Sequence, residues 1–406
     1  KLYYSPTDSE GHVVCFAGSG LGKTSSILIP TLQHWDGTCY VVDISGDICQ
    51  NVEIPHKIIY NPDDTDGVLY NIFSPVDMFE TNMTDTSVFF LTEGRKILTA
   101  AMITYYHQGM DFPQICKRII SSSWSTLFSE IDQNGNYEAK QYINSFEGTN
   151  EKNIAGCKQA CDSALKLFAT NSHVYNAIGR EREGKEAFTP EQLENKNIFV
   201  VIQDSKLELY EPLVHIITAQ CMEYFSNRDN NNQHTILMCL DEFASFGHLE
   251  ITPALRKLRK KHVRIMVLTQ SLADIDLIYG RDERMAMLNN FAYKIVLGCS
   301  DSDTQEYFSR LIGEKEVYRK AVSKNGKQVT NTKTEAKERI VPPAELARLG
   351  RHMILLAEGR YYKLTKNYYF ELDLWNRVKK CINNLSRIQE EDFSEKNTLS
   401  LTDENK

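Results

Sequence analysis

The sequence has 406 residues, of which 42% are hydrophobic and 25% are charged, a composition typical of globular proteins. This length predicts two or three domains with a substantial core. The formal net charge of -8 excludes a broadly basic nucleic-acid-binding protein, so any nucleic-acid site must be a local basic surface.

Residues 12–17 are predicted to form the first strand, and they lead into Ala17-Gly18-Ser19-Gly20-Leu21-Gly22-Lys23-Thr24. This stretch has the spacing [AG]-x-x-x-x-G-K-[ST], and the apolar run that follows it predicts a helix, so the motif has its expected strand–loop–helix context. Glycines let a backbone wrap closely round a phosphate, while the new helix offers its positive end. The stretch is therefore interpreted as a phosphate-binding loop for ATP.

Each part of this loop has a predicted role. Lys23 is expected to reach the β- and γ-phosphates and so to act in catalysis, and the Thr24 hydroxyl is expected to bind Mg²⁺. The residues predicted to bind the nucleotide are Gly18, Ser19, Gly20, Leu21, Gly22, Lys23, Thr24 and Ser25.

The chain after the loop continues an alternating α/β pattern. Pro30 is expected to kink or stop the first helix near Trp35. Residues 38–43 read as a second buried strand ending in Asp43, at the strand end where α/β sheets place ligand-binding groups. Gly46 and Asp47 follow in a turn, and residues 58–60 form a short third strand.

The pattern becomes helical after about residue 77. Residues 86–107, 112–131, 137–146 and 153–170 all have apolar residues at helical spacing, and no strand-like run interrupts them before Ile198. We therefore predict an all-α domain inserted into the α/β domain. The predicted limits are 1–79 for the first part of the nucleotide-binding domain, 80–187 for the insert, 188–375 for the second part, and 376–406 for a polar tail.

A second acidic motif follows where the sheet resumes. Residues 197–202 and 235–240 are predicted strands, and the latter ends in Asp241 and Glu242. A strand that ends in two acids is common by itself, but together with the phosphate-binding loop it indicates an ATPase. Asp241 is predicted to hold Mg²⁺ through water, and Glu242 to polarise the attacking water.

A basic run comes next, with six basic residues among positions 254–264. Three interpretations stay open for it: a solvated helix face, a surface that follows DNA phosphates, or an arginine finger that acts on a neighbouring subunit's nucleotide. Gln270 follows the predicted strand at 263–269. It is expected to act in catalysis by sensing the γ-phosphate or orienting the attacking water, and the alternative is a strand-end amide that binds the backbone.

The last third of the chain adds further elements. Residues 293–298 are predicted to form a strand, 301–312 a helix capped by Asp301 or Ser302, and 314–341 a polar hairpin or loop. Edge strands are expected at 353–357 and 361–370, followed by a disordered end.

The cysteines indicate a reducing compartment. Ten cysteines are scattered through the chain, some in apolar runs such as Val14-Cys15-Phe16, which is typical of buried free thiols. Cys157 and Cys161 lie four residues apart, but no second pair completes a metal site, so we interpret them as one helix face.

The order of these motifs resembles the coupling-protein ATPases of conjugative type IV secretion systems. The residues that carry the resemblance are Gly18 to Thr24 with Ile29 to Leu32 and Trp35, Val41 to Asp47, Tyr70-Asn71, Leu240 to Phe243 with Gly247, Gln270 to Leu272 with Tyr279-Gly280, and Pro342 to Leu346. The resemblance runs from about residue 11 to 369 and is weakest in the helical segment.

The resemblance implies a RecA-like P-loop NTPase domain interrupted by an all-α domain that meets substrates. Members form homo-hexameric rings at the cytoplasmic face of the bacterial inner membrane and have transmembrane helices absent here. No run in this sequence approaches the roughly 20 apolar residues that span a bilayer, and the chain starts at Lys1 without Met, so we expect it to be part of a longer protein. The implied partners are single-stranded DNA with its relaxase and the secretion channel, to which ATP hydrolysis delivers them.

The family's arginine finger falls on Arg259. In a ring only the lumen needs to be basic, so DNA binding would be compatible with the acidic net charge. The residues that could line the lumen in six copies are Arg256, Lys257, Lys260 and Lys261. The chain departs from the family at Ser45 and Asp47, where members often have Lys and Glu, and at Leu258, where many have Gly.

Two functions from different classes therefore compete. The first is a DNA-translocating motor of conjugation; the alternative is a docking receptor for relaxase or effector proteins, with nucleotide binding serving assembly. The presence of Glu242 favours hydrolysis. A different ring ATPase is disfavoured by the helical insert and by residues 342–346, and a small-molecule kinase by the size of the insert.

Overall fold

The computed structural model describes residues 11–73, 86–180, 184–325 and 328–371. The chain divides into two compact units. The first unit comprises Lys1–Cys15 with Asp36–Lys294, and the second comprises Phe16–Trp35 with Ile295–Lys406.

The first unit is built on a parallel sheet. Its strands lie in the order β1 (His12–Ala17), β8 (Val263–Thr269), β7 (Ile236–Leu240), β2 (Thr38–Asp43), β6 (Asn197–Val201) and β3 (Lys57–Tyr60). Every pair of neighbours from β8 to β3 is parallel. All residues of β2 and β7 are buried, which explains why these strands are continuous apolar runs rather than alternating ones.

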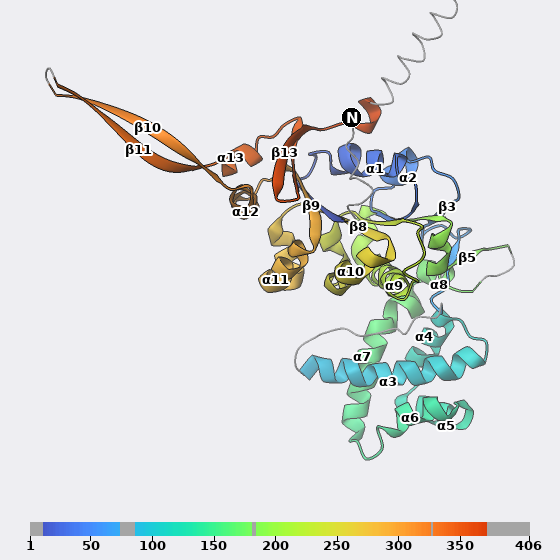
Figure 1. Ribbon diagram of the computed structural model, residues 1–406. Coiled ribbons are helices and arrows are strands. Elements are labelled where there is room, and N and C mark those ends of the chain that lie inside the picture. The colour runs from blue at the N-terminus through green and yellow to red at the C-terminus, as the bar shows by residue number, and fades with distance from the viewer. Residues whose placement is uncertain (1–10, 74–85, 181–183, 326–327, 372–406) are drawn as a thin grey trace, which may run out of the picture. The chain divides into compact units, whose positions relative to one another are not determined.

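Helices dominate the middle of the first unit, as predicted. They are α3 (Thr86–His107), α4 (Phe112–Ser121), α5 (Trp124–Asn134), α6 (Tyr137–Asn144), α7 (Glu151–Thr170) and α8 (Ser172–Ala177). Helix α3 packs against α4, α6 and α7, and these helices are drawn in cyan and green in Figure 1.

Two details differ from the expected helical pattern. The segment 112–131 is two helices, because Ser123 caps the start of α5 by accepting a hydrogen bond from the Thr126 backbone N–H at 3.1 Å. A short strand pair also precedes Ile198: β5 (Ala187–Phe188) pairs in parallel with β4 (Leu69–Tyr70). The sequence did not predict the break between α4 and α5, because the helical spacing of apolar residues continues in phase across the capping residue Ser123.

The remaining elements of the first unit connect its strands. They are α2 (Asp47–Asn51), η2 (Pro190–Glu194), η3 (Asp204–Lys206), α9 (Leu207–Ser226), η4 (Phe243–Phe246), α10 (Ile251–Lys257), η5 (Leu258–Lys261) and α11 (Leu272–Asn289).

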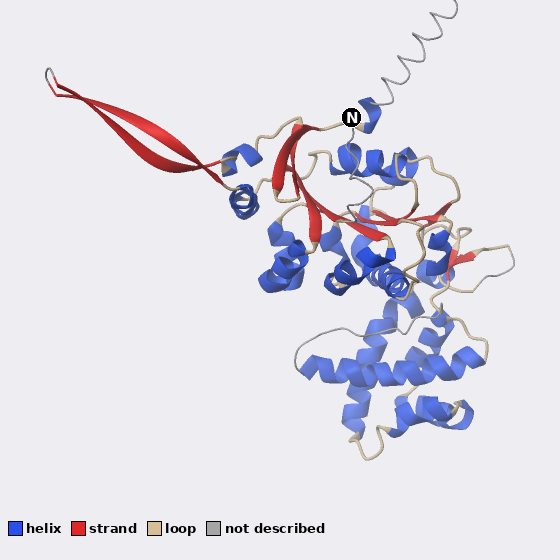
Figure 2. Cartoon of the chain, viewed as in Figure 1, coloured by secondary structure: helices blue, strands red, loops and turns tan. Residues whose placement is uncertain are grey.

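The second unit contains the loop and the C-terminal strands. Its strands lie in the order β13 (Arg360–Thr365), β12 (His352–Ala357), β9 (Phe291–Gly298) and β1, so β1 and β9 each begin in the first unit and end in the second. Figure 2 shows the long antiparallel hairpin of β10 (Glu314–Asn325) and β11 (Gln328–Arg339), which confirms the predicted hairpin at 314–341. Helices α12 (Ser302–Ile312), capped by Asp301, and α13 (Pro343–Leu346) complete the unit.

The helix after the glycine-rich loop begins as a π-helical turn, η1 (Thr24–Leu28), and continues as α1 (Ile29–Gln33). The Ile29 N–H bonds to the Thr24 carbonyl, and Pro30 has no N–H to continue the ladder. The helix ends at His34, close to the predicted exit at Trp35.

Two sequence predictions concern the chain as a whole. Among the described residues, eight cysteines are buried and Cys49 is half-buried, all as free thiols, and Cys157 and Cys161 lie on α7 as expected. None of the described helices combines the length and hydropathy needed to cross a membrane. The predicted disordered end and the polar tail lie outside the described residues.

Candidate functional site

The glycine-rich loop has the backbone that close approach to a ligand requires. Gly20 and Gly22 have φ values of +73° and +89°, in the left-handed region that disfavours residues with a Cβ. The Gly18 N–H donates to the Gly298 carbonyl at 3.1 Å, and the Ser26 N–H donates to the Gly22 carbonyl at 2.9 Å. These bonds join the loop to the end of β9 on one side and to its own helix on the other.

Lys23 and Thr24 lie at the junction of this loop and the helix. Thr24 is the first residue of η1, so its hydroxyl is placed at the helix start, the end that carries the positive partial charge of the helix. The Lys23 residue is only 7% exposed, so its side chain packs at the loop rather than extending into solvent. An ammonium group and helix N–H groups at one loop form an anion-binding arrangement.

The predicted acidic pair lies in the first unit, at the carboxyl end of β7. Asp241 is buried, and its Oδ1 accepts a hydrogen bond from the Glu242 N–H at 3.0 Å. Glu242 has φ +48°, a left-handed conformation that is costly for a residue with a side chain and is often found at functional sites. The stacking of Phe243 on Tyr279, with centroids 5.5 Å apart, fixes the chain directly after it.

Gln270 lies beside Glu242. Its Nε2 donates to Glu242 Oε2 at 3.3 Å, because β7 and β8 are parallel neighbours with Leu240 opposite Val267. Ser271 then caps α11 by accepting a bond from the Asp274 N–H. The carboxyl edge of the sheet therefore brings together Asp241, Glu242 and Gln270, which the sequence separates by nearly thirty positions.

Asp43 also lies at the carboxyl edge of the sheet, but its side chain hydrogen-bonds to the turn that follows β2. Its carboxyl accepts hydrogen bonds from the N–H groups of Gly46 at 2.9 Å and Cys49 at 2.7 Å. Burial raises the pKa of the Asp43 carboxyl, and these N–H groups oppose that shift. Asp43 thus holds the turn before α2 in place, while Ser45 and Asp47 are exposed.

Arg259 lies at the opposite edge of the sheet from Glu242. It belongs to η5, which precedes β8, whereas Glu242 follows β7, a strand parallel to β8. A strand of the length of β8 spans about 20 Å. Arg259 is therefore not close to Glu242 of its own chain, although both belong to the first unit.

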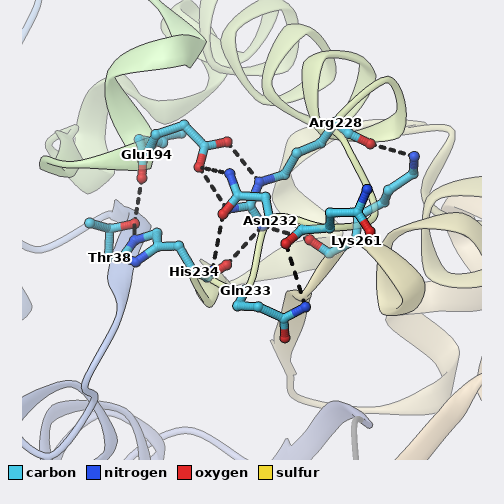
Figure 3. Close-up of polar contacts among 9 residues, drawn as sticks. Thr38, Glu194, Arg228, Asn232, Gln233, His234 and Lys261 are labelled. Atoms are coloured by element: carbon cyan, nitrogen blue, oxygen red, sulfur yellow. Dashed lines mark hydrogen bonds and ion pairs between the residues drawn. The ribbon is translucent and has the colours of Figure 1, made fainter.

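The basic run is divided by its contacts. Four of the basic residues are exposed: Arg256, Lys257, Arg259 and Lys260. The ammonium group of Lys261 instead donates to the Arg228 carbonyl. Figure 3 shows the surrounding cluster, in which Arg228 donates to Glu194 Oε1 at 2.7 Å and to the Lys261 carbonyl at 2.6 Å. Lys261 thus fixes the end of η5 and Arg264 is half-buried, which leaves four of the six basic residues to form the exposed surface.

Sequence reasoning missed the residues that contact the loop from the C-terminal segment. Lys366 is 2% exposed and donates from Nζ to the Leu21 carbonyl at 3.1 Å. A Cβ added at Gly22 would lie 2.9 Å from Cε1 of Tyr368. No local pattern marks these residues, because the loop and its neighbours are separated by more than 340 positions.

Comparison with known proteins identifies the group to which this arrangement belongs. The family described as Type IV secretory system Conjugative DNA transfer matches residues 2–96 and 91–396. The chain belongs to this family.

Named relatives are similar at low identity. Protein VirD4 of Agrobacterium fabrum is 20% identical over 344 residues, covering 77% of this chain and 51% of the relative. Conjugal transfer protein TraG of the same species is 21% identical over 347 residues, covering 77% and 52%. The chain spans about half the length of these relatives.

Solved structures agree with the fold. The unbound monoclinic form of the bacterial conjugative coupling protein TrwBdeltaN70 has a TM-score of 0.72 at 20% identity, covering 88% of this chain and 84% of that one. The plasmid coupling protein TrwB in complex with ADP and Mg²⁺ has a TM-score of 0.69, also at 20% identity. These likenesses confirm the predicted α/β, RecA-like P-loop NTPase fold.

Proposed function

We propose that this chain is the ATP-hydrolysing part of a coupling protein that recruits a relaxase bound to single-stranded DNA and delivers it to a type IV secretion channel. The observation that carries the proposal is the strand–loop–helix at residues 12–33, with left-handed Gly20 and Gly22 and with Lys23 packed at the loop. Family membership gives this phosphate-binding geometry a context of DNA transfer.

The residues proposed to bind and hydrolyse ATP have separate tasks. Backbone N–H groups from Gly18 to Ser25 bind the phosphates, and Lys23 neutralises charge on the β- and γ-phosphates. Glu242 accepts a proton from the attacking water, and Gln270, hydrogen-bonded to Glu242, orients it. The left-handed backbone of Glu242 favours this catalytic role over a docking receptor that only binds nucleotide.

The residues present also suit Mg²⁺. The Thr24 hydroxyl and the Asp241 carboxylate are hard oxygen donors of the kind that this ion prefers. When bound with ATP, Mg²⁺ would neutralise developing charge on the phosphates. The relative TrwB is described in complex with ADP and Mg²⁺, which supports the same ligands here.

The proposed partners follow from the family and from the exposed basic residues. Arg256, Lys257 and Lys260 provide a surface for DNA phosphates, and Arg259 acts on the nucleotide of a neighbouring subunit in a hexamer at the cytoplasmic face of the membrane. The helical segment, proposed to be a domain of residues 80–187, recruits the protein substrate.

The test is ATP turnover of this chain across protein concentration, with and without single-stranded DNA. Turnover is expected to rise with both. Lys23→Ala is expected to abolish turnover, since transition-state charge on the phosphates loses its counter-charge. Glu242→Gln is expected to bind ATP but to hydrolyse it at least about 100-fold more slowly, because the general base is lost. Lys166→Ala, at an exposed position of α7, is the matched control.

Three results would count against parts of the proposal. Normal turnover in Lys23→Ala would exclude the phosphate-binding role of the loop. Loss of ATP binding in Glu242→Gln would contradict its role as a base. Tight ATP binding without turnover or DNA response in the unaltered chain would favour the docking receptor.

A further inference from the structure

The chain after β13 returns to the phosphate-binding loop. Lys366 is 2% exposed, and its Nζ donates to the Leu21 carbonyl at 3.1 Å. Its backbone N–H donates to the Arg351 carbonyl at 2.8 Å. A buried lysine therefore holds this segment against the loop, within the second unit.

Tyr368 touches the loop itself. A Cβ at Gly22 would lie 2.9 Å from Cε1 of Tyr368, 3.4 Å from Ser25 Oγ and 3.5 Å from Ser26 Oγ. The Tyr368 ring thus lies on the side of the loop where the first helical turn begins. Lys23 reaches toward the terminal phosphates, so the sugar and base of a bound nucleotide leave from the α-phosphate end of the loop.

Tyr368, which is half-buried, stacks with the exposed Phe370. Its ring lies 5.3 Å from that of Phe370, with an interplanar angle of 18°. Phe370 is 52% exposed, and the Arg351 guanidinium lies 5.8 Å from the Tyr368 centroid. We call Tyr368 and Phe370 the aromatic platform. Burying an aromatic ring normally stabilises a globular domain. An exposed ring in a stack beside the phosphate-binding loop therefore suggests a ligand that has a π-face of its own.

We propose that the aromatic platform binds the nucleobase of the nucleotide whose phosphates occupy the loop, an inference that rests on the proposed function. The base stacks on Phe370, whose stacking partner Tyr368 lies against the loop at Gly22. Stacking depends on a π-face that every base has, so it does not read base identity. The platform therefore binds adenine and guanine nucleotides alike.

The experiment compares dissociation constants of three ligands, ATP, GTP and inorganic tripolyphosphate, by calorimetry on the full chain. In Phe370→Ala, affinity for ATP and GTP is expected to fall about 5- to 150-fold, the range seen when a base-stacking ring is removed. Affinity for tripolyphosphate is expected to stay unchanged, because it has no base. Phe370→Tyr keeps the π-face and is expected to keep affinity, and Tyr137→Ala, at a residue 79% exposed on α6, is the control.

The outcomes separate the platform from the loop. Unchanged ATP affinity in Phe370→Ala, or equal loss for ATP and tripolyphosphate, would overturn the platform, the latter because it shows a packing effect on the loop. A change in oligomeric state without loss of affinity would instead assign Phe370 to a contact between copies. If Lys23→Ala abolishes binding of all three ligands, the phosphate-binding role of the loop stands whatever Phe370→Ala does; if the unaltered chain binds none, both proposals fall.

Discussion

His12, at the start of β1, is a buried histidine held in its neutral form by two backbone groups. Its Nε2 donates to the Leu255 carbonyl at 2.9 Å, and its Nδ1 accepts from the Ile265 N–H at 3.0 Å. An accepting Nδ1 leaves no room for a second proton. Burial lowers the pKa of His12 from 6.5 to about 4.

This histidine predicts a pH dependence of stability. Between pH 6.5 and 4 the unfolded chain binds a proton at His12 and the folded chain does not, so stability is lost as pH falls. From pH 7 to 5 the free energy of unfolding should drop by about 2 kcal/mol on this account. Urea titrations at both pH values measure the drop. His12→Gln, which does not titrate, should show a smaller drop, although it is less stable at pH 7; equal drops would contradict the assignment.

At the scale of elements, one arginine joins four segments of the first unit. Arg228 follows α9 and forms a bidentate pair with Glu194 of η2, while its Nη1 also donates to the carbonyls of His234, before β7, and Lys261, at the end of η5. Its side chain is 2% exposed. These contacts, drawn in Figure 3, fix the segment that carries Arg259.

We predict that Arg228→Ala lowers the free energy of unfolding by about 3 kcal/mol, because it leaves Glu194 without its partner and frees two carbonyls. Arg228→Lys should recover only part of the loss, since an ammonium group cannot make the planar bidentate pair. The control is Arg310→Ala on α12, whose ion pair with Glu306 is exposed and contributes less than about 1 kcal/mol. Thermal unfolding measures all three, and equal effects of Arg228→Ala and Arg310→Ala would show that the cluster is not a structural centre.

At the scale of the whole molecule, the position of Arg259 decides how many chains a working site needs. Arg259 lies at the amino edge of the sheet and Glu242 at the carboxyl edge of the same unit. We therefore predict that Arg259 acts on the site of another copy, as a heterologous ring contact would allow. On this prediction Arg259 contributes to turnover only when several copies assemble.

Mixing two inactive variants tests this prediction. Lys23→Ala retains Arg259, and Arg259→Ala retains the phosphate-binding loop, so mixed rings contain some sites with both. With random equal mixing about a quarter of sites should be intact, and turnover should recover to at most about that fraction. If one of the two variants is unfolded by heat before mixing, ATP turnover should not recover. No recovery in mixed assemblies, with Arg310→Ala fully active alone, would leave Arg259 as a surface charge.

The sequence by itself determined the local chemistry of this protein. Glycines at fixed spacing between a strand and a helix define the loop at residues 17–24, and continuous apolar runs define the buried strands that end in Asp241 and Gln270. Helix α3 (Thr86–His107) has the predicted bounds. Backbone conformation and burial pattern act over a few neighbouring residues, which is why they can be read from the sequence.

Only the tertiary structure decided which distant residues meet. Because of the strand order, Gln270 hydrogen-bonds to Glu242, whereas Arg259 lies at the opposite edge of the sheet. Lys261 donates to the Arg228 carbonyl, which distinguishes it from its exposed basic neighbours. Lys366 and Tyr368 reach the loop across most of the chain. These contacts depend on the order of the strands in the sheet and on which residues pack against the glycine-rich loop. Neither property produces a periodic pattern in the sequence.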